Sequence, residues 1–239
     1  MTGGREREVV LAVGAHPDDV ELGVGGTLAK HRTAGHPVFV LTLTRGEASL
    51  PDGQEIGRLE ESRRALEELR VAPGCIYTCD LGDTVLPSRI AEIAEAVQRT
   101  IQETGATVMY APAGADEHQD HRATALAVSA ATRLRAEPRT ILAYETVSAR
   151  LSKFNPVWTE ALSAEEMERK IAALRHHRSQ AHKAYMDPDY VLGLARWRAL
   201  EAGLRTGWAE AFALTRRIRT EGAERHGEPK EARADRRQA

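Results

Sequence analysis

Short apolar segments alternate with amphipathic helical segments over the first 144 residues, and this alternation restricts the folds open to the chain. Runs such as 9–15 (VVLAVGA) and 38–44 (VFVLTLT) are β-branched and almost wholly apolar, which is typical of buried parallel strands. The expected strands are 9–15, 38–44, 75–77, 108–111 and 140–144. The expected helices are 20–35, 56–70, 87–104 and 123–135. Because strand–helix–strand units cross over with one hand, this pattern predicts an α/β fold, a Rossmann-like, mainly parallel sheet flanked by helices in the strand order 3-2-1-4-5.

The pattern changes after Val147. Segments 163–178 and 190–206 have helical spacing, and the stretches between and after them are irregular and contain Trp and Tyr. We expect this part to be a helical and irregular extension that packs on the sheet. Residues 216–239 are dense in charge and poor in large apolar side chains, which favours a tail without fixed structure. The expected organisation is therefore a single domain over 1–215 followed by a charged, flexible tail over 216–239.

Composition excludes several classes of protein. The 239 residues carry 33 Lys and Arg against 35 Asp and Glu, so the chain lacks the basic excess typical of proteins that bind DNA or RNA. No apolar run reaches the roughly 18–20 residues of a membrane helix, and the amino terminus lacks the features of a signal peptide. Two cysteines cannot supply a disulfide framework for a domain of this size. We therefore expect a cytoplasmic protein that binds neither nucleic acid nor membranes.

The first candidate site follows the first expected strand. His16, Asp18 and Asp19 lie in the segment AHPDDVE, at the carboxyl edge of the sheet, where open α/β folds bind ligands. Adjacent carboxylates repel each other unless a cation or protons offset the repulsion. A helix cap at Asp18 or Asp19 is the simpler interpretation, but it accounts for only one of the carboxylates.

A second cluster, DEHQDH at 116–121, follows the fourth expected strand. Taken alone, such a run is most often a solvated loop and the start of a helix. In the strand order 3-2-1-4-5, however, strands one and four are neighbours at the switch point, so the loops after them face each other across one crevice. His and Asp side chains about a hundred residues apart then converge, which predicts a metal site.

Histidine and carboxylate ligands suit zinc, and a catalytic zinc keeps three protein ligands and one open position. A bound divalent metal lowers the pKa of water from about 15.7 to about 7, which supplies a nucleophile at neutral pH. A carboxylate that does not ligate the metal can serve as the base, and a free histidine can serve as the acid. The two clusters contain enough residues for three ligands, a base and an acid.

Two segments carry a resemblance to a known family: 15–29, which reads AHPDDVELGVGGTLA, and 118–121, which reads HQDH. Smaller matches lie at 44–47 (TRGE), 58–61 (RLEE), 179–180 (SQ) and 209–212 (AEAF). On these motifs the chain resembles the LmbE-like (PIG-L) family of zinc-dependent N-deacetylases over roughly residues 9–215. It looks most similar to the bacterial branch that acts on N-acetylglucosaminyl conjugates in thiol biosynthesis.

The resemblance implies that His16, Asp19 and His121 bind the metal, which is Zn²⁺, although another divalent ion such as Fe²⁺ also suits these ligands. It implies hydrolysis of the N-acetyl group of an N-acetylglucosamine-type conjugate, a small-molecule substrate. Members of the family are often oligomers, and the apolar, Trp-bearing helices after residue 190 are consistent with a homo-oligomer.

The resemblance also implies the catalytic groups. Asp18 looks like the general base that activates metal-bound water. His118 looks like the group that stabilises the tetrahedral oxyanion or protonates the leaving amine, and Asp120 orients it. Arg58 is similar to a family arginine near the substrate, so we expect it to be a substrate-binding residue.

Two functions of other classes remain open at this point. His16, Asp18 and the distant His121 also match the 2-His-1-carboxylate site of non-haem Fe(II) oxygenases, although those enzymes usually have all-β folds. A non-catalytic sugar- or metal-binding protein can have the same fold, but such a protein has no need of Asp18 and His118 together.

Two further features have structural explanations. The segment 23–26 (GVGG) lacks the GxGxxG spacing of dinucleotide-binding turns, and we attribute its glycines to close packing of a helix on the sheet. His176, His177 and His182 lie beside basic residues, which indicates a solvated, basic surface more than a second metal site.

Overall fold

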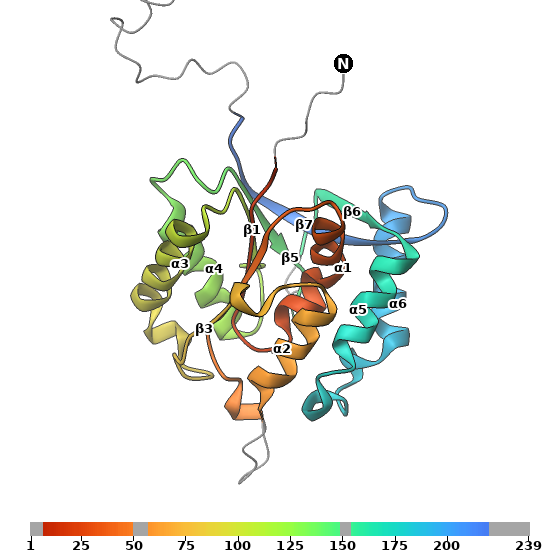
Figure 1. Cartoon of the computed structure of the whole chain (residues 1–239), viewed down its shortest axis with the longest axis horizontal. Helices are drawn as coiled ribbons and strands as arrows, with labels where there is room; N and C mark the ends of the chain where they lie inside the picture. The colour runs from red at the N-terminus through yellow and green to blue at the C-terminus, as the bar shows by residue number, and fades with distance from the viewer. Residues whose placement is uncertain (1–6, 50–56, 149–153, 220–239) are drawn as a thin grey trace, which may run out of the picture.

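The structure is a computed structural model that describes residues 7–49, 57–148 and 154–219. In this part of the chain seven strands form one mixed sheet in the order β3-β2-β1-β4-β5-β7-β6 (Figure 1). The strands are β1 (Val10–Gly14), β2 (Val38–Thr42), β3 (Ile76–Thr78), β4 (Val108–Pro112), β5 (Thr140–Tyr144), β6 (Trp158–Leu162) and β7 (Trp208–Arg217). Strands β1 to β5 pair in parallel, in the order expected from the sequence. The Rossmann-like, mainly parallel α/β fold is therefore confirmed.

Helices cover both faces of this sheet. They are α1 (Asp19–Thr33), α2 (Arg58–Glu68), α3 (Ile90–Thr104), α4 (Gln119–Thr132), α5 (Ala164–Leu174) and α6 (Pro188–Glu201). Helices α3 and α4 pack against each other on one face, whereas α1, α2 and α5 lie together on the other (Figure 1). Helix α6 packs against α5 and β7, so the C-terminal helices extend the second layer.

Alternate residues of β1 enter two different cores. Val10 and Ala12 pack with apolar residues of α1 and α2, whereas Leu11 and Val13 pack with those of α3 and α4. Because both faces of the strand are covered, every side chain of β1 is buried. This explains the unbroken apolar run at 9–15, which lacks the polar alternation of a half-exposed strand.

Strands β6 and β7 were not expected. Strand β7 pairs antiparallel with β5 on one side and with β6 on the other. Charged residues interrupt the apolar pattern of both, and one of them, Glu210 in β7, is buried. Its carboxylate accepts hydrogen bonds from the backbone N–H groups of Gly26 (3.0 Å) and Thr27 (2.7 Å) and from Lys170 Nζ (2.6 Å). Glu210 interrupts the apolar pattern by which β7 could have been predicted, and the same residue bonds β7 to α1.

The expected tail begins too early by at least two residues. Arg216 and Arg217 belong to β7, because they continue its pairing with Ile141 and Thr140 at the start of β5. Residues 220–239, the bulk of the expected tail, lie outside the described residues. The two C-terminal helices expected from the sequence are present as α5 and α6, with 3₁₀ turns between them.

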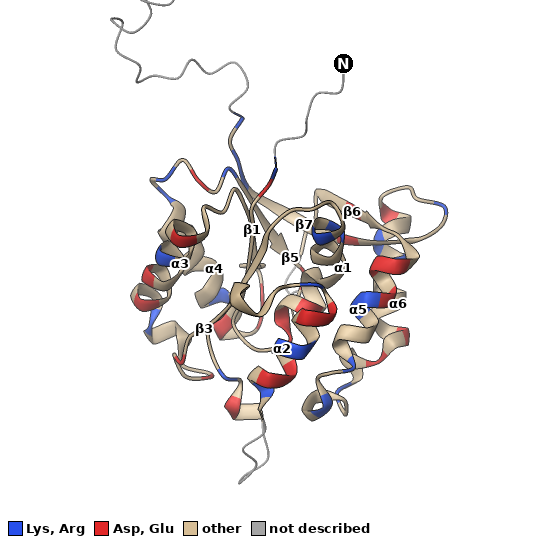
Figure 2. Ribbon diagram, viewed as in Figure 1, with Lys and Arg blue, Asp and Glu red and all other residues tan. Residues whose placement is uncertain are grey.

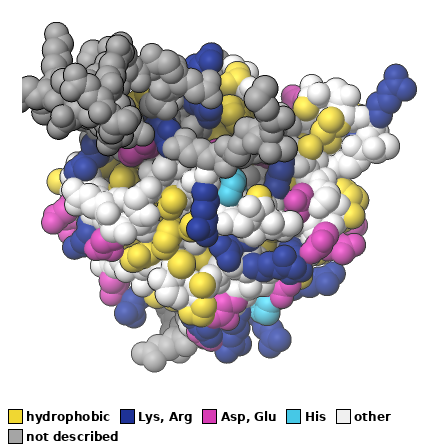
Figure 3. Space-filling model, turned by 45° about the horizontal axis from the view of Figure 1, so that its top comes forward, with side chains coloured by type: hydrophobic (Ala, Val, Ile, Leu, Met, Phe, Trp, Pro, Cys, Tyr) yellow, Lys and Arg dark blue, Asp and Glu magenta, His cyan; other side chains and the backbone are white. Residues whose placement is uncertain are grey.

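Acidic and basic residues are interspersed along the helices (Figure 2). The face shown in Figure 3 has the same mixture, in agreement with the near-neutral composition of the chain. Among the helices in the described residues, none combines the length and the apolar character needed to cross a membrane.

Helix α1 approaches its neighbours closely through two glycines. A Cβ atom added to Gly23 would lie 2.2 Å from Cδ2 of Tyr144, and one added to Gly26 would lie 2.4 Å from Cδ1 of Leu162. At Gly25 the nearest atom would be 3.4 Å away, which is ordinary contact. The packing explanation for the segment 23–26 thus applies to Gly23 and Gly26.

We expect Gly23→Ala to lower the free energy of unfolding by about 1–3 kcal/mol, because the new methyl group overlaps the buried Tyr144 ring. Gly25→Ala in the same helix is the matched control. It removes a glycine from a helix interior without a clash, so it should be neutral or stabilise by up to about 1 kcal/mol. Urea unfolding followed by circular dichroism measures both, and equal destabilisation by the two variants would contradict this packing.

Candidate active site

The loop after β1 and the start of α4 meet at the carboxyl edge of the sheet. His16 Nε2 lies 3.2 Å from Asp120 Oδ2, although the two residues are 104 positions apart in the sequence. His121 Nε2 lies 3.1 Å from Asp19 Oδ1, across 102 positions. All four side chains are buried. The structure therefore brings together the two clusters that the strand order was expected to juxtapose.

Asp19 lies between the two histidines. Its Oδ2 accepts the backbone N–H of His16 at 2.8 Å and lies 3.4 Å from His16 Nδ1, while its Oδ1 faces His121. Burial by itself would raise the pKa of Asp19, but the two histidines hold it well below its usual value. For His121 burial acts in the opposite direction and lowers the pKa, but the Asp19 charge outweighs burial and raises this pKa to about 9. The three side chains stabilise one another's charges in a buried position.

A second carboxylate holds the other ring nitrogen of each histidine. His121 Nδ1 lies 3.0 Å from Asp116 Oδ2, and His16 Nε2 lies 3.1 Å from Asp83 Oδ1 as well as near Asp120. In metal sites such outer carboxylates fix the tautomer and the orientation of a ligating imidazole. Each histidine therefore has one nitrogen at Asp19 and the other at a supporting carboxylate.

Asp83 and Asp116 were not assigned a role from the sequence. Asp116 stands within the DEHQDH cluster, and it also accepts hydrogen bonds from the hydroxyl groups of Thr146 and Ser148. Asp83 follows β3, and the carboxyl ends of parallel strands lie at one edge of a sheet. Its position after a predicted strand could therefore have indicated that it belongs to the site.

This arrangement fits a zinc-like ion. Two ligand atoms on a tetrahedral zinc with bonds of about 2.0–2.1 Å lie about 3.3 Å apart. Asp19 Oδ1 lies 3.1 Å from His121 Nε2, and Asp19 Oδ2 lies 3.4 Å from His16 Nδ1, so each pair by itself has that spacing. Ring nitrogens of His16, His118 and His121 also lie within 4.8 Å of one another. The site thus has the donors and the spacing to hold a divalent metal.

Asp18 precedes α1 with a left-handed backbone (φ 115°), and its side chain makes no capping hydrogen bond. The cap interpretation of Asp18 is therefore wrong. Its Oδ2 instead accepts a hydrogen bond from Arg58 Nη2 at 3.0 Å. Burial raises the pKa of Asp18 to about 6, against the lowering effect of the Arg58 charge. A non-glycine residue in such a conformation costs about 1–3 kcal/mol, which the Arg58 contacts help to offset.

Arg58 is only 3% exposed, and both of its Nη atoms are bonded to protein groups. Nη1 donates to the Gly46 carbonyl at 2.7 Å and to Ser49 Oγ at 2.6 Å, and Nη2 also donates to the Pro17 carbonyl at 2.6 Å. These contacts fasten the loop after β2 to the start of α1 and hold Asp18 in place. The expected contact between Arg58 and a substrate stays a prediction.

His118 is the N-cap residue of α4 and is only partly buried. Its Nδ1 accepts the backbone N–H of Asp120 at 3.2 Å, so Asp120 orients it through the main chain. The Asp120 carboxylate is engaged elsewhere, by His16 and by the backbone N–H of Thr84 (2.7 Å). Burial and the charges of His121 and His16 lower the pKa of His118. A neutral His118 that accepts at Nδ1 carries its proton on Nε2.

Comparison with known proteins agrees with this geometry. Residues 11–132 match the model of the family described as PIG-L: GlcNAc-PI de-N-acetylase. A protein of Escherichia coli (strain K12) named "Uncharacterized deacetylase YaiS" is 36% identical over 186 residues, which cover 75% of this chain and 95% of that protein. The chain belongs to the PIG-L family.

Two further comparisons of this PIG-L family member are with proteins that are named as deacetylases. The "1D-myo-inositol 2-acetamido-2-deoxy-alpha-D-glucopyranoside deacetylase" of Rhodococcus erythropolis (strain PR4 / NBRC 100887) is 30% identical over 208 residues, 73% of this chain and 67% of that protein. The solved structure of N,N'-diacetylchitobiose deacetylase from Pyrococcus horikoshii superposes with a TM-score of 0.72 at 23% identity, covering 87% of this chain and 84% of the other. That structure supports the shared fold.

In this PIG-L family member His177 lies beneath the site and is 1% exposed. Its Nε2 is 3.1 Å from Glu21 Oε1, which also accepts a hydrogen bond from Ser62 Oγ at 2.7 Å. The expectation of a solvated surface is therefore wrong for His177, because the turn after α5 folds back onto α1 and α2. The basic residues next to His177 in the sequence had indicated a solvated surface, whereas His177 forms a buried pair with the Glu21 carboxylate.

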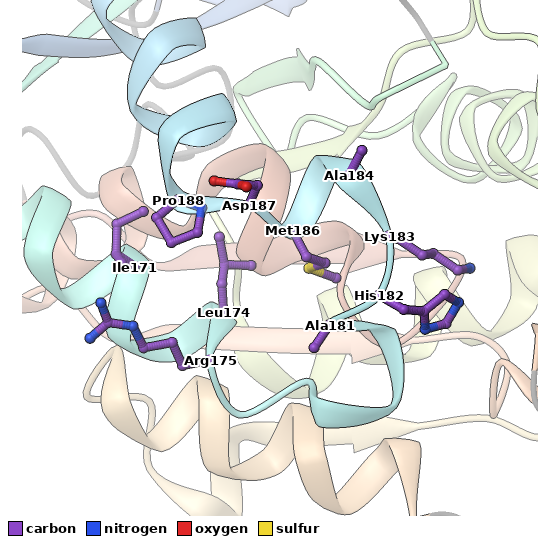
Figure 4. Close-up of a pocket in the computed structure, with 10 residues that line it drawn as sticks. All are labelled: Ile171, Leu174, Arg175, Ala181, His182, Lys183, Ala184, Met186, Asp187 and Pro188. Atoms are coloured by element: carbon purple, nitrogen blue, oxygen red, sulfur yellow. The ribbon is translucent and has the colours of Figure 1, made fainter.

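A cavity of about 390 Å³ lies between the end of α5 and the start of α6 (Figure 4). Arg175, His182 and Lys183 line it together with apolar residues such as Met186. Burial lowers the pKa of Lys183, and the charge of Asp18 opposes this effect. His182 is exposed, as expected from the sequence.

We expect Arg58→Gln to lower the free energy of unfolding by about 3–5 kcal/mol at pH 8, because it leaves the buried Asp18 carboxylate without its cation. Arg45→Gln is the control, since Arg45 pairs with Asp80 on the surface, where such pairs contribute less than about 1 kcal/mol. Guanidinium unfolding curves give both values. A loss at Arg58 no greater than at Arg45 would refute the positioning role.

Proposed function

We propose that this chain is a metal-dependent amide hydrolase that removes the N-acetyl group from an N-acetylglucosamine-type conjugate. One observation carries the proposal: beside the His16–Asp19–His121 group lie a carboxylate and a neutral histidine that are not needed to hold a metal. The names of the relatives, which are deacetylases of acetamido sugars, support the choice of substrate class.

His16, Asp19 and His121 would hold the metal, with Asp83, Asp116 and Asp120 orienting the two imidazoles. Nitrogen and carboxylate donors suit Zn²⁺, and Fe²⁺ is compatible with the same set. When bound, such an ion polarises an amide carbonyl and makes a water molecule acidic enough to attack it near neutral pH.

Asp18 is the base in this proposal. One of its oxygens is held by Arg58, so the carboxylate has a fixed direction and keeps acceptor capacity for the proton of the attacking water. A base that is positioned in this way typically contributes about 10²–10⁴ to the rate.

His118 is the proton donor in this proposal. With Nδ1 occupied by the Asp120 N–H, its Nε2–H is available to a substrate oxygen or to the departing nitrogen. The proton that Asp18 takes from water replaces the one that His118 gives to the departing nitrogen. The acetic acid that forms gives up its own proton to the amine, so amide and water give acetate and an ammonium group.

The α/β fold and the family relationship argue against the oxygenase alternative, whose enzymes usually have all-β folds. A protein that only binds sugar or metal would have no use for the backbone strain and buried charge at Asp18.

We expect Asp18→Asn to retain as much bound metal as the wild-type protein while acetate release falls by about 10²–10⁴, because the variant loses the base and no ligand. Glu117→Gln, an exposed acid next to His118, should keep near wild-type turnover. Metal analysis and an acetate assay over N-acetylglucosaminyl conjugates test this. Unchanged turnover in Asp18→Asn would exclude Asp18 as the base.

Removal of the metal with a chelator should abolish acetate release, and addition of Zn²⁺ or Fe²⁺ should restore it. We also expect Asp116→Asn to weaken metal binding by about 10–100-fold, since His121 loses the carboxylate that orients it. Competition against a zinc-binding dye measures the affinity, with the exposed Asp187→Asn as control. Full activity after complete demetallation would contradict the proposed chemistry.

A further inference from the structure

A second group of metal-ligating side chains lies at the opposite edge of the sheet. Glu8 precedes β1, His31 is in the last turn of α1, and His36 lies in the turn before β2. Gly35 adopts a left-handed conformation (φ 81°), and the backbone N–H of His36 donates to the His31 carbonyl at 3.0 Å. This turn brings the two imidazoles face to face, with ring centroids 5.2 Å apart.

The three ligand atoms have the spacing of a coordination site. His31 Nδ1 and His36 Nδ1 are 3.0 Å apart, and Glu8 Oε2 lies 3.8 Å from the first and 3.6 Å from the second. Ligand atoms on a tetrahedral zinc are separated by about 3.3 Å. A hydrogen bond between the histidines would account for one of these approaches, but it leaves the position of Glu8 next to both nitrogens unexplained.

The surroundings also resemble those of a metal site. His31 Nε2 lies 2.9 Å from the hydroxyl of Tyr110, a buried residue of β4, which directs the opposite nitrogen toward His36. The neighbouring Lys30 ammonium is occupied by Glu160 (2.6 Å) and by the Ala161 carbonyl (3.1 Å). The histidine side chains are 13% and 17% exposed and that of Glu8 is 42% exposed, so an ion can enter from solvent.

We propose that Glu8, His31 and His36 form a second divalent-cation site of the zinc class, separate from the active site. Two neutral imidazoles and one carboxylate supply three ligands and one negative charge, and water completes the coordination. A cation held there ties the segment before β1 to the end of α1 and to the start of β2. This second cation site does not depend on the deacetylase proposal.

Metal stoichiometry tests the site directly. Folded wild-type protein dialysed against Zn²⁺ should hold two equivalents per chain, as measured by native mass spectrometry and elemental analysis. His36→Gln should hold one and keep its hydrolytic activity, whereas Asp19→Asn combined with His121→Gln should hold one and lose activity. The variant with all three changes should hold none, and His176→Gln, at a histidine outside both groups, should still hold two.

Stability gives a readout that does not involve the active site. In the Asp19→Asn, His121→Gln background, Zn²⁺ at about 100 times its dissociation constant should raise the melting temperature by roughly 5–10 °C. Adding His36→Gln or Glu8→Gln should remove that shift. The proposal would be overturned by one equivalent of Zn²⁺ in the wild-type protein or by two in His36→Gln. It would also be overturned if the shift in melting temperature persisted after His36→Gln and after Glu8→Gln.

Discussion

The Asp19 carboxylate is the interaction on which the rest of the site depends. It contacts His16 from its own loop and His121 from a helix about a hundred residues later, so it joins the two sides of the switch point. Without a negative charge there, the two buried imidazoles would have carboxylates only at their other ring nitrogens. Outer carboxylates contact the other nitrogens of these two rings, and the His118 ring stacks on that of His121.

Buried charge in this protein is tolerated because each such group has a partner that is itself held in place. Asp18 faces Arg58, Glu210 faces Lys170, and both cations also donate to backbone carbonyls. An ion pair of this kind contributes little net stability, but loss of one member is costly because the other is left unpaired. The pairs therefore specify the geometry of the edge where substrate is proposed to bind more than they stabilise the fold.

The parallel part of the sheet and the meeting of the two clusters could be predicted from the sequence, because buried strands are continuous apolar runs and the switch-point rule needs only their order. Strand β7 could not be predicted, because Glu210 interrupts its apolar pattern. That residue is present for its hydrogen bonds to α1, which are tertiary contacts that the local sequence does not reveal. The burial of His177 was hidden by the same kind of effect. Its basic neighbours indicate solvent, whereas its partner Glu21 lies on a helix 156 residues earlier.

The bond between Glu210 and α1 also sets an order of events during synthesis. Helix α1 carries Asp19 at its first turn, and its middle is bonded to a strand formed near the end of the described chain, 184 residues later. Contacts that span so much sequence form late in folding. A ribosome-bound chain that lacks β7 leaves the amides of Gly26 and Thr27 without their acceptor. In such a chain the helix that carries Asp19 is therefore not yet held at its middle by Glu210.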